Sequence, residues 1–436
     1  METITLEMWT SAVVLVVAYV LIFSEILHRT IAAIFGAVMM VGIGMWMGFY
    51  TQEAAILAVD GNTILLLAAM MMLVALLRPT GAFDYAAVHI TRWAQGNPKL
   101  LLIYLSLAVS LISMILDNVT TVIVFAPLTV LICRLLKLNP MPYLMAEAML
   151  SNIGGAATLV GDPPNLMIGS AADISFNSFL VHMGLPVLVV WLGTVVLMLY
   201  LFREQLSHGG EDPKTLVATH AIKDARGLKR ILFALAIVVV LFFVHHNLHL
   251  LPAYASFIGL TIALLLMQPD MEKLFGSVNW SVLIFFAGLF IIVGGVESSG
   301  LLELVGHWLG RLAKDPAMLM LTGLALMWIA AILSAVVDNI PFTVTMIPVI
   351  LGLESSGVNI APLWWALALG VGLGGNGTHL GATANIIAVS ESEKSGMPEA
   401  RISPMLWMRT GMPVMFFGLL LASLVYWLFF DMFTTA

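Results

Sequence analysis

Two short polar stretches interrupt long apolar runs of this sequence and contain the residues best suited to chemistry. Residues 117–121 (DNVTT) lie in the run LISMILDNVTTVIVFAP, and residues 338–339 (DN) lie in the run ILSAVVDNIPFTVTMIP. Acids and amides are costly to bury in hydrocarbon, so their presence there predicts a functional site. Pro127 and Pro348 each follow the acid by ten residues, and we therefore interpret the chain as two copies of one unit.

Each half also contains a Gly-rich break, SNIGGAATLVGDPPNLMI at 151–168 and LGGNGTHLGATANIIAV at 373–389. Glycine lets the backbone unwind, and the freed N–H and C=O groups can then bind a ligand. Pro163-Pro164 prevents a continuous helix through the first break. We expect substrate to be bound by amides and hydroxyls of the polar stretches and the breaks: Asn118, Thr120, Thr158, Asn165, Asn339, Asn376, Thr378 and Asn385.

Four carboxylates are candidates for carrying the coupling proton or cation: Asp117, Asp338, Glu147 and Asp162. A carboxyl group buried in an apolar setting exchanges its proton nearer neutral pH than an exposed one does. We expect Asp117 and Asp338 to approach each other near the midplane, where at least one of them would be protonated. Asp162 has no acidic counterpart, because Ala382 stands at the matching position of the second half.

Each of these assignments has a plainer alternative. Asp and Asn are common helix N-caps, so the acid–amide pairs could be structural caps. Glycines in membrane helices often serve only close packing. A lone histidine such as His379 is more often a hydrogen-bonded structural group, and the 28 methionines are most simply packing residues. We favour the functional interpretation because an acid and an amide occur together in both halves, and packing does not explain clustered amides.

The composition indicates the class of protein that positions these residues. The 436 residues are 61% hydrophobic and 10% charged, which leaves too few charges to cover a soluble protein of this length. Apolar runs of membrane-spanning length recur from end to end, so we expect an all-α polytopic membrane protein. Cys133 is the only cysteine, which excludes internal disulfides and thiolate metal sites. No catalytic or phosphate-binding motif is present, so we expect no enzyme activity, no cofactor and no bound metal.

The repeat organises the whole chain into an N-terminal repeat, a linker and an inverted C-terminal repeat. Gly155, Thr158 and Asn165 match residues of the second half that lie 220 positions later, as expected of a duplicated unit. Such inverted repeats with broken helices place the substrate site near the midplane, at the repeat interface. The expected segments are the N-terminal repeat 1–202 with hairpin 100–133 and broken helix 143–171, the linker 203–230, and the C-terminal repeat 231–436 with hairpin 317–353 and broken helix 361–390.

The distribution of basic residues predicts the orientation of the chain. If each hairpin re-enters the membrane and each broken helix crosses once, 16 of the 18 Lys and Arg residues fall on one side. Basic loops favour the cytoplasm. The linker is therefore expected to be cytoplasmic and both termini periplasmic, in a multi-pass protein of the cell inner membrane.

The motifs LDNVTTVIVFAPLT, SNIGGAATLVGDPPNLMIGSA, DNIPFTVTMIP and GGNGTHLGATANIIAVS together resemble the ion transporter superfamily. Within it they are similar to the branch of ArsB-type arsenite permeases and the melanosomal P protein. The resemblance implies a scaffold domain and a transport domain in each inverted half, an elevator-type motion and a homodimer. Carboxylate carriers of the superfamily have Ser-Asn-Thr at each hairpin tip, where this chain has 117–119 (DNV) and 338–340 (DNI). Two acids in place of two serines disfavour a dianionic substrate, because like charges repel.

These observations favour a secondary active transporter that exports arsenite or antimonite in exchange for protons. Arsenite near neutral pH is an uncharged trihydroxide, which needs hydroxyl, amide and carboxylate partners. The alternatives are a sodium/proton antiporter, an anion or carboxylate carrier of the same superfamily, and, outside transport, a membrane-embedded enzyme or receptor. The expected partners are arsenite or antimonite, protons or sodium, the lipid bilayer, a second copy of the chain and an arsenite-stimulated ATPase subunit, with no nucleic acid.

Overall fold

The computed structural model describes residues 4–24, 26–207, 209–210, 222–302, 304, 316–336, 339–355 and 357–435. Every regular element in these ranges is a helix, and eight of the helices are long and apolar enough to cross a membrane. The prediction of an all-α polytopic membrane protein is therefore confirmed.

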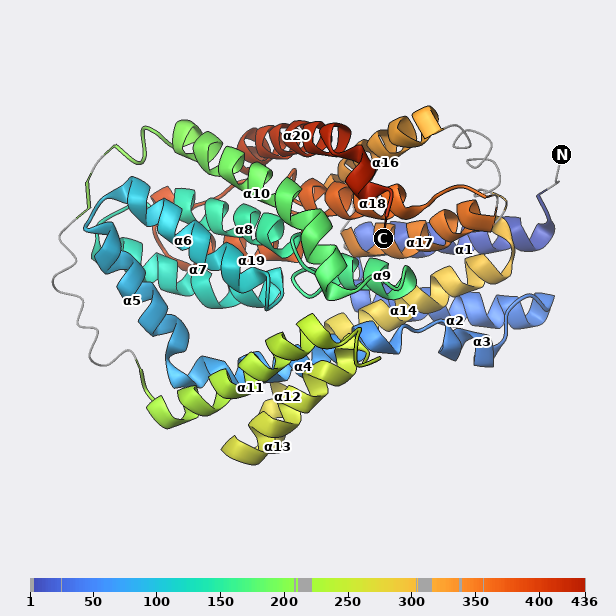
Figure 1. The fold of residues 1–436 in the computed structure, drawn as a ribbon, viewed down its shortest axis with the longest axis horizontal. Coiled ribbons are helices and arrows are strands. Elements are labelled where there is room, and N and C mark those ends of the chain that lie inside the picture. The colour runs from blue at the N-terminus through green and yellow to red at the C-terminus, as the bar shows by residue number, and fades with distance from the viewer. Residues whose placement is uncertain are drawn as a thin grey trace.

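The helices of the first half are α1 (Leu6–Phe23), α2 (Arg29–Met47), α3 (Gln52–Leu57), α4 (Gly61–Leu77), η1 (Arg78–Thr80), α5 (Ala82–Ala94), α6 (Pro98–Ser113), α7 (Asn118–Leu135), α8 (Met141–Gly155), α9 (Pro163–Ala171) and α10 (Phe176–Leu201). Those of the second half are α11 (Ala225–Val244), α12 (Pro252–Met267), α13 (Met271–Gly276), α14 (Trp280–Ser298), α16 (Pro316–Val336), α17 (Asn339–Ser355), α18 (Ala361–Gly374), α19 (Thr383–Lys394), η4 (Pro398–Ala400), α20 (Pro404–Leu428) and α21 (Phe430–Phe433). Figure 1 shows their arrangement.

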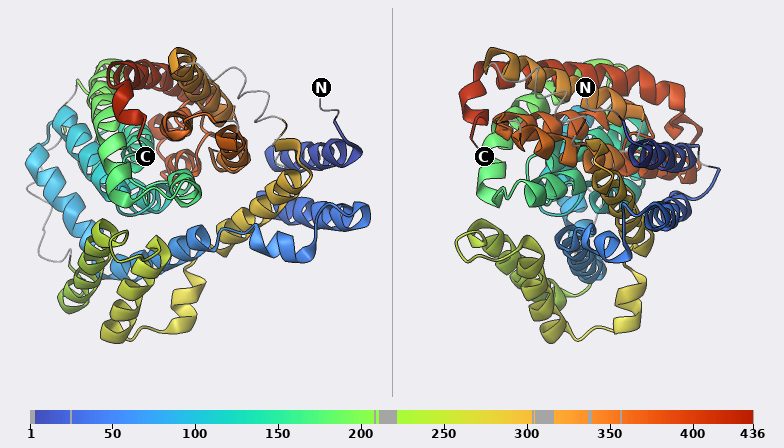
Figure 2. Two further views of the ribbon diagram at one scale, coloured as in Figure 1. Left: turned by 45° about the vertical axis from the view of Figure 1, so that its right-hand side comes forward. Right: turned by 90° about the vertical axis from the view of Figure 1, so that its right-hand side faces the viewer.

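The helices separate into two groups. In the left view of Figure 2, α6–α10 and α16–α20 form a compact bundle, and α1–α4 with α11–α14 lie along one side of it. We call the first group the bundle helices and the second the frame helices. Within the frame, α11 and α12 pack on each other and on α4, while α14 packs on α2. Within the bundle, α6 packs on α8 and α16 packs on α18.

The predicted hairpins and broken helices coincide with helix boundaries. Hairpin 100–133 corresponds to α6 and α7, and hairpin 317–353 corresponds to α16 and α17. Broken helix 143–171 corresponds to α8 and α9, which are separated by seven non-helical residues at 156–162. Its counterpart corresponds to α18 and α19, and α19 continues to Lys394, beyond the expected end.

Helix α5 lies outside the hairpin and the broken helix that the sequence predicts for the N-terminal repeat. It has buried residues such as Phe83 and Ile90 on one face and exposed residues such as Tyr85 and Trp93 on another. A search for continuous apolar runs misses this pattern, because an amphipathic helix alternates apolar and polar residues along the chain. The helix joins α4 of the frame to α6 of the bundle.

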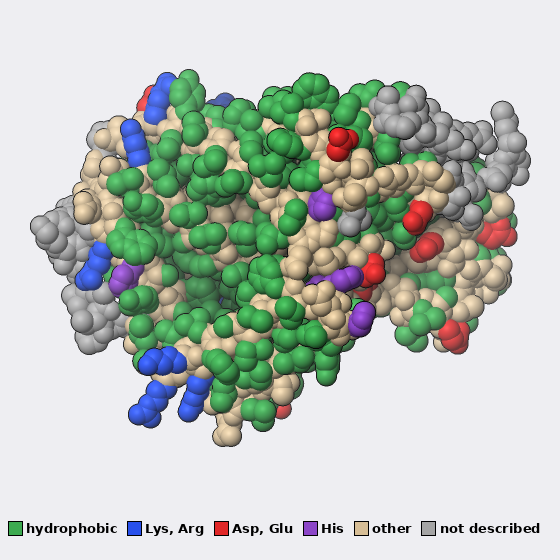
Figure 3. All heavy atoms as spheres, viewed as in Figure 1, with side chains coloured by type: hydrophobic (Ala, Val, Ile, Leu, Met, Phe, Trp, Pro, Cys, Tyr) green, Lys and Arg blue, Asp and Glu red, His purple; other side chains and the backbone are tan. Residues whose placement is uncertain are grey.

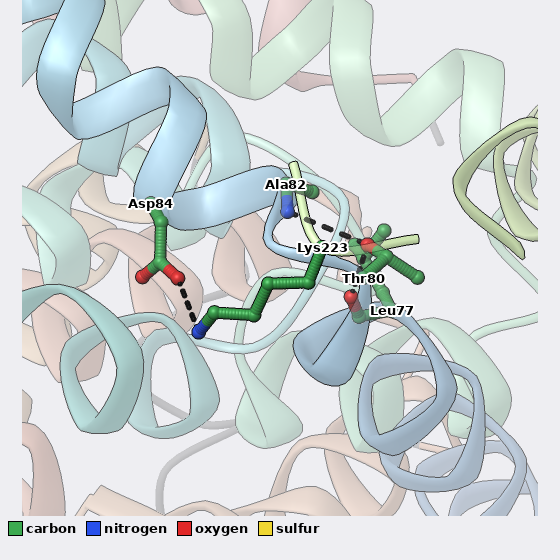
Figure 4. A network of polar contacts seen from close by, with 5 residues as sticks. All are labelled: Leu77, Thr80, Ala82, Asp84 and Lys223. Atoms are coloured by element: carbon green, nitrogen blue, oxygen red, sulfur yellow. Dashed lines mark hydrogen bonds and ion pairs between the residues drawn. The ribbon is translucent and has the colours of Figure 1, made fainter. Parts of the chain in front are cut away.

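The described end of the linker is attached to the corner between α4 and α5, as Figure 4 shows. Lys223 Nζ lies 2.8 Å from Asp84 Oδ2 on α5. The backbone N–H groups of Lys223 and Asp224 both donate to Thr80 O. Thr80 Oγ1 donates to Leu77 O at 2.6 Å, which closes the last turn of the corner. The start of α11 is thus fixed against the end of α4.

Charge is distributed unevenly along the long axis of the molecule. On the face shown in Figure 3, the Lys and Arg side chains lie mostly at one end and the Asp and Glu side chains mostly at the other. By the positive-inside rule, the basic end would be cytoplasmic.

A reporter fusion tests this orientation. A reporter inserted at 210–222 is expected to be cytoplasmic, while reporters near Asp60 and at the C-terminus are expected to be periplasmic, as the predicted arrangement of two inverted repeats requires. Alkaline phosphatase and green fluorescent protein fusions measure the two compartments. A cytoplasmic C-terminus would contradict the inverted arrangement, since it requires an odd change in the number of crossings.

Candidate functional site

A cavity of about 230 Å³ lies between the frame and the bundle. The frame contributes a mostly apolar wall that includes Leu67, Met71 and Phe286. The bundle contributes the ends of four helices, α7, α9, α17 and α19. We call the polar side chains at three of these ends the polar floor: Asp117, Asn118, Asp162 and Asn339.

Asp117 is buried at the tip of the first hairpin, where it caps α7. Its Oδ1 accepts from Thr120 N at 2.8 Å, and its Oδ2 accepts from Thr120 Oγ1 at 2.5 Å. Both oxygens therefore have partners within one helical turn, as expected of an N-cap. The equivalent acid, Asp338, lies outside the described residues, so the expected approach of Asp117 and Asp338 stays a prediction.

Asp162 joins the two hairpin tips. Asn118 Nδ2 donates to Asp162 Oδ1 at 3.4 Å, and Asn339 Nδ2 donates to Asp162 Oδ2 at 3.1 Å. Asp162 precedes α9 but makes no side-chain cap to it, so its carboxylate faces the tips instead. The side chain is 2% exposed. One carboxylate of the first half thus holds an amide from each half.

A chain of amides continues from the tips into the breaks. Asn118 Nδ2 also donates to Asn152 Oδ1 at 3.0 Å. Asn152 Nδ2 in turn donates to Asn376 Oδ1 at 2.9 Å and to Asn385 Oδ1 at 3.0 Å. Asn152 therefore connects the first hairpin to the second broken helix.

The breaks are held by the same hydrogen bonds in both halves. Asn165 Nδ2 donates across the first break to Gly155 O at 3.2 Å and Thr158 O at 3.0 Å. Asn385 Nδ2 donates across the second break to Gly375 O at 2.7 Å and to Thr378 O at 2.9 Å. These two residues lie 220 positions after Gly155 and Thr158. These amides stabilise the unwound backbone, so in this conformation they act on the chain itself.

The two break threonines have matching partners as well. Thr158 Oγ1 donates to Met114 O, and Thr378 Oγ1 donates to Ala335 O. Glycine is required where the backbone of each break turns back on itself. A Cβ on Gly155 would lie 2.5 Å from Gly161 O, closer than real Cβ contacts allow.

Glu147 is placed apart from the cavity. It is fully buried on α8, where its Oε1 accepts a hydrogen bond from Thr129 Oγ1 on α7. Among the residues that the structure describes, Glu147 Oε2 has no hydrogen-bond partner, and His379 Nδ1 has none either. Asn118 Oδ1 is likewise unpartnered within the described ranges. Asn118 differs from the other two because the residue lines the cavity, although its Oδ1 is itself buried.

The sequence did not predict that basic residues line this cavity. Arg29 opens α2, and its Nη1 donates to Thr383 Oγ1 at the start of α19, at 3.1 Å. The guanidinium also lies over the ring of Phe285, 5.3 Å from its centroid. Arg78 lines the cavity from η1. Both arginines flank apolar runs, and such positions normally indicate only the cytoplasmic end of a spanning helix.

A sequence profile described as "Citrate transporter", CitMHS, matches residues 19–370. The chain belongs to the CitMHS family. The "46 kDa membrane protein" of Mycobacterium leprae is 37% identical to this CitMHS member over 424 residues, 95% of this chain and 97% of that protein. An uncharacterized transporter of Mycobacterium tuberculosis is 37% identical over 423 residues, again 95% and 97% of the two chains. The human P protein is 32% identical over 479 residues, which are 91% of this chain but 57% of that protein.

A solved structure supports the fold of this CitMHS protein. The YdaH transporter of Alcanivorax borkumensis aligns with a TM-score of 0.62 and 16% identity, over 93% of this chain and 99% of that one. The protein is therefore a membrane transporter and not an enzyme, and its predicted membership of the ion transporter superfamily is confirmed.

Proposed function

We propose that this CitMHS transporter exports arsenite or antimonite across the inner membrane in exchange for protons. The observation that supports this most is the chemistry of the polar floor. Asp162 lies between two amides, Asp117 lines the same cavity, and Asn118 Oδ1 has no partner among the described residues. The floor is therefore rich in hydrogen-bond acceptors and carries negative charge when ionised.

An uncharged trihydroxide matches such a floor. Each of its three O–H groups is a donor, and carboxylate and amide oxygens are acceptors. A carboxylate substrate would instead meet Asp162 at close range in a poorly solvated site, where like charges repel strongly. The acids of the floor thus favour a neutral substrate over an anionic one.

Proton exchange can act on the contact between the tips. When Asp162 is ionised, each of its oxygens accepts one tip amide, and the tips are held together. A protonated Asp162 has an O–H donor in place of one acceptor, so one of the two contacts weakens. A proton entering from the periplasm would then release the tips, and the bundle would move against the frame in an elevator-type cycle. A homodimer and an ATPase subunit fit this scheme as partners.

A carboxylate carrier is the second candidate. Arg29 and Arg78 line the same cavity from the frame side, and two guanidinium groups are the usual partners of carboxylates. The family description, citrate transport, agrees with this alternative.

Everted membrane vesicles separate the two candidates. We expect uptake of arsenite that rises with an imposed proton gradient and is unaffected by excess citrate. Asn118→Ala and Asn339→Ala should each reduce that uptake roughly 5- to 150-fold, because each removes a tip amide from Asp162 (about 1–3 kcal/mol). Asn359→Ala changes an exposed amide far from the cavity and serves as the control. Uptake of citrate without uptake of arsenite would favour the carboxylate carrier, and sodium-driven proton release alone would favour a sodium/proton antiporter.

A further inference from the structure

A second cavity, of about 280 Å³, lies at the end of α11, away from the polar floor. Three histidines from the turn between α11 and α12 line it, His245, His246 and His249, together with Asp173 from the turn between α9 and α10. We call it the histidine cavity. The start of α11 follows the cytoplasmic linker, so the other end of this spanning helix, and the cavity with it, would face the periplasm.

The ring of His245 makes two hydrogen bonds beside this cavity. Its ring is 6% exposed, and its Nδ1 lies 2.9 Å from Leu250 O, which can only accept a hydrogen bond. Nδ1 therefore carries the hydrogen. Its Nε2 lies 3.3 Å from Phe176 N, which can only donate, so Nε2 must be the unprotonated acceptor. These two contacts require the neutral ring with one defined tautomer.

The backbone N–H of Phe176 donates its hydrogen bond to this histidine. Phe176 is the first residue of α10, and the first amides of a helix have no partner within it. The contact also joins the two groups of helices, because α10 belongs to the bundle and His245 ends a frame helix. Neighbouring contacts keep the two ends together: Asn177 Nδ2 donates to Phe243 O at 2.8 Å, and the Phe176 ring lies 5.7 Å from that of Phe242.

We propose that His245 is a pH-sensitive latch between the frame and the bundle at the periplasmic face. A proton on Nε2 and the hydrogen bond from Phe176 exclude each other, because both need the same lone pair. Histidine is the side chain that changes charge between about pH 5 and 8. Acidification of the periplasmic side would therefore open the latch and weaken the attachment of α10 to the frame, which the Asn177 and Phe176 ring contacts would still hold. The proposal requires only that the two groups move relative to each other, and it holds for any substrate.

Other ionisable groups surround the latch. Asp173 faces the histidine cavity from the bundle side. His246 and His249 face it from the same turn as His245. On the frame side, Asp60 caps the start of α4, two residues before Asn62 of the cavity wall. On α10 itself, His182 is stacked on Trp365, with ring centroids 4.4 Å apart.

Hydrogen exchange of the full-length protein in lipid nanodiscs tests the latch without any transport assay. The peptide that contains the Phe176 amide is followed at pH 7.5 and 5.5, with correction for the intrinsic pH dependence of exchange. We expect protection of this amide to fall about fivefold at pH 5.5, as for the loss of one hydrogen bond. His245→Gln keeps an acceptor that does not titrate, so its protection should be the same at both pH values, while His246→Gln should behave as the wild type.

Two results would overturn the proposal. One is a wild-type protein whose protection at Phe176 does not change between the two pH values. The other is a His245→Gln variant that loses protection at pH 5.5 as the wild type does, since the sensor would then be another group. Because wild-type exchange alone decides the first result, the test remains valid even if the variant does not fold.

Discussion

Replacing Asp162 by asparagine is expected to uncouple transport from the proton gradient. The variant keeps the size of the side chain but cannot bind or release a proton. Its amide oxygen can accept from only one of Asn118 and Asn339, and its own NH₂ group would face the other donor. Leaving one buried donor unpaired costs about 1–3 kcal/mol, so the state with joined tips should be populated roughly 5- to 150-fold less.

The measurement is arsenite flux in vesicles with and without a pH difference. Wild-type flux should rise with the gradient, whereas Asp162→Asn should show a slow flux that is the same in both conditions. Asp431→Asn is the control, because it makes the same chemical change at an exposed position on α21 that does not line the cavity. If Asp162→Asn retains its full response to the gradient, the coupling proton must be carried by Asp117, Asp338 or Glu147 instead.

Much of this site could be predicted from the sequence, for a physical reason. Burying amides and acids inside apolar runs is costly unless the fold provides partners for them. Their presence in the hairpin tips and the breaks therefore predicted a site there. The constant separation of 220 positions paired Asn165 with Asn385, and the two amides make equivalent hydrogen bonds in the structure. Local sequence was sufficient here because each amide acts on a break only ten residues or fewer away.

The meeting of the tips at Asp162 could not be predicted in the same way. The repeat predicted a meeting of Asp117 and Asp338, because these two acids occupy matching positions. Asp162 has no acidic counterpart, since Ala382 occupies the matching position. Which acid faces both tips depends on how α9 lies between α7 and α17, and spacing along the chain does not determine that packing. Arg29 was missed for a similar reason, since a basic residue at the start of an apolar helix normally reports only orientation.

Removing the amides that hold the breaks should be the most destabilising of the polar substitutions considered for this protein. Asn165→Ala leaves Gly155 O and Thr158 O without their side-chain donor in a buried loop. Each buried carbonyl deprived of a partner costs about 1–3 kcal/mol, so for two carbonyls we expect a loss of about 2–6 kcal/mol in the free energy of unfolding. Asn385→Ala should cost more, because Asn385 Oδ1 also accepts from Asn152.

The ranking of stability can be measured by thermal unfolding in detergent, with the fraction of protein that stays monodisperse as the signal. The expected ranking of melting temperatures is wild type and Asn359→Ala highest, then Asn165→Ala, then Asn385→Ala. Asn359 is the control because its side chain is exposed: its amide donates to Thr434 O, its Oδ1 accepts from Ala361 N at the start of α18, and water can replace much of what the substitution removes. If Asn165→Ala and Asn385→Ala unfold like the wild type but fail to transport, the two amides act on the substrate, and the breaks are held by their threonines and glycines alone.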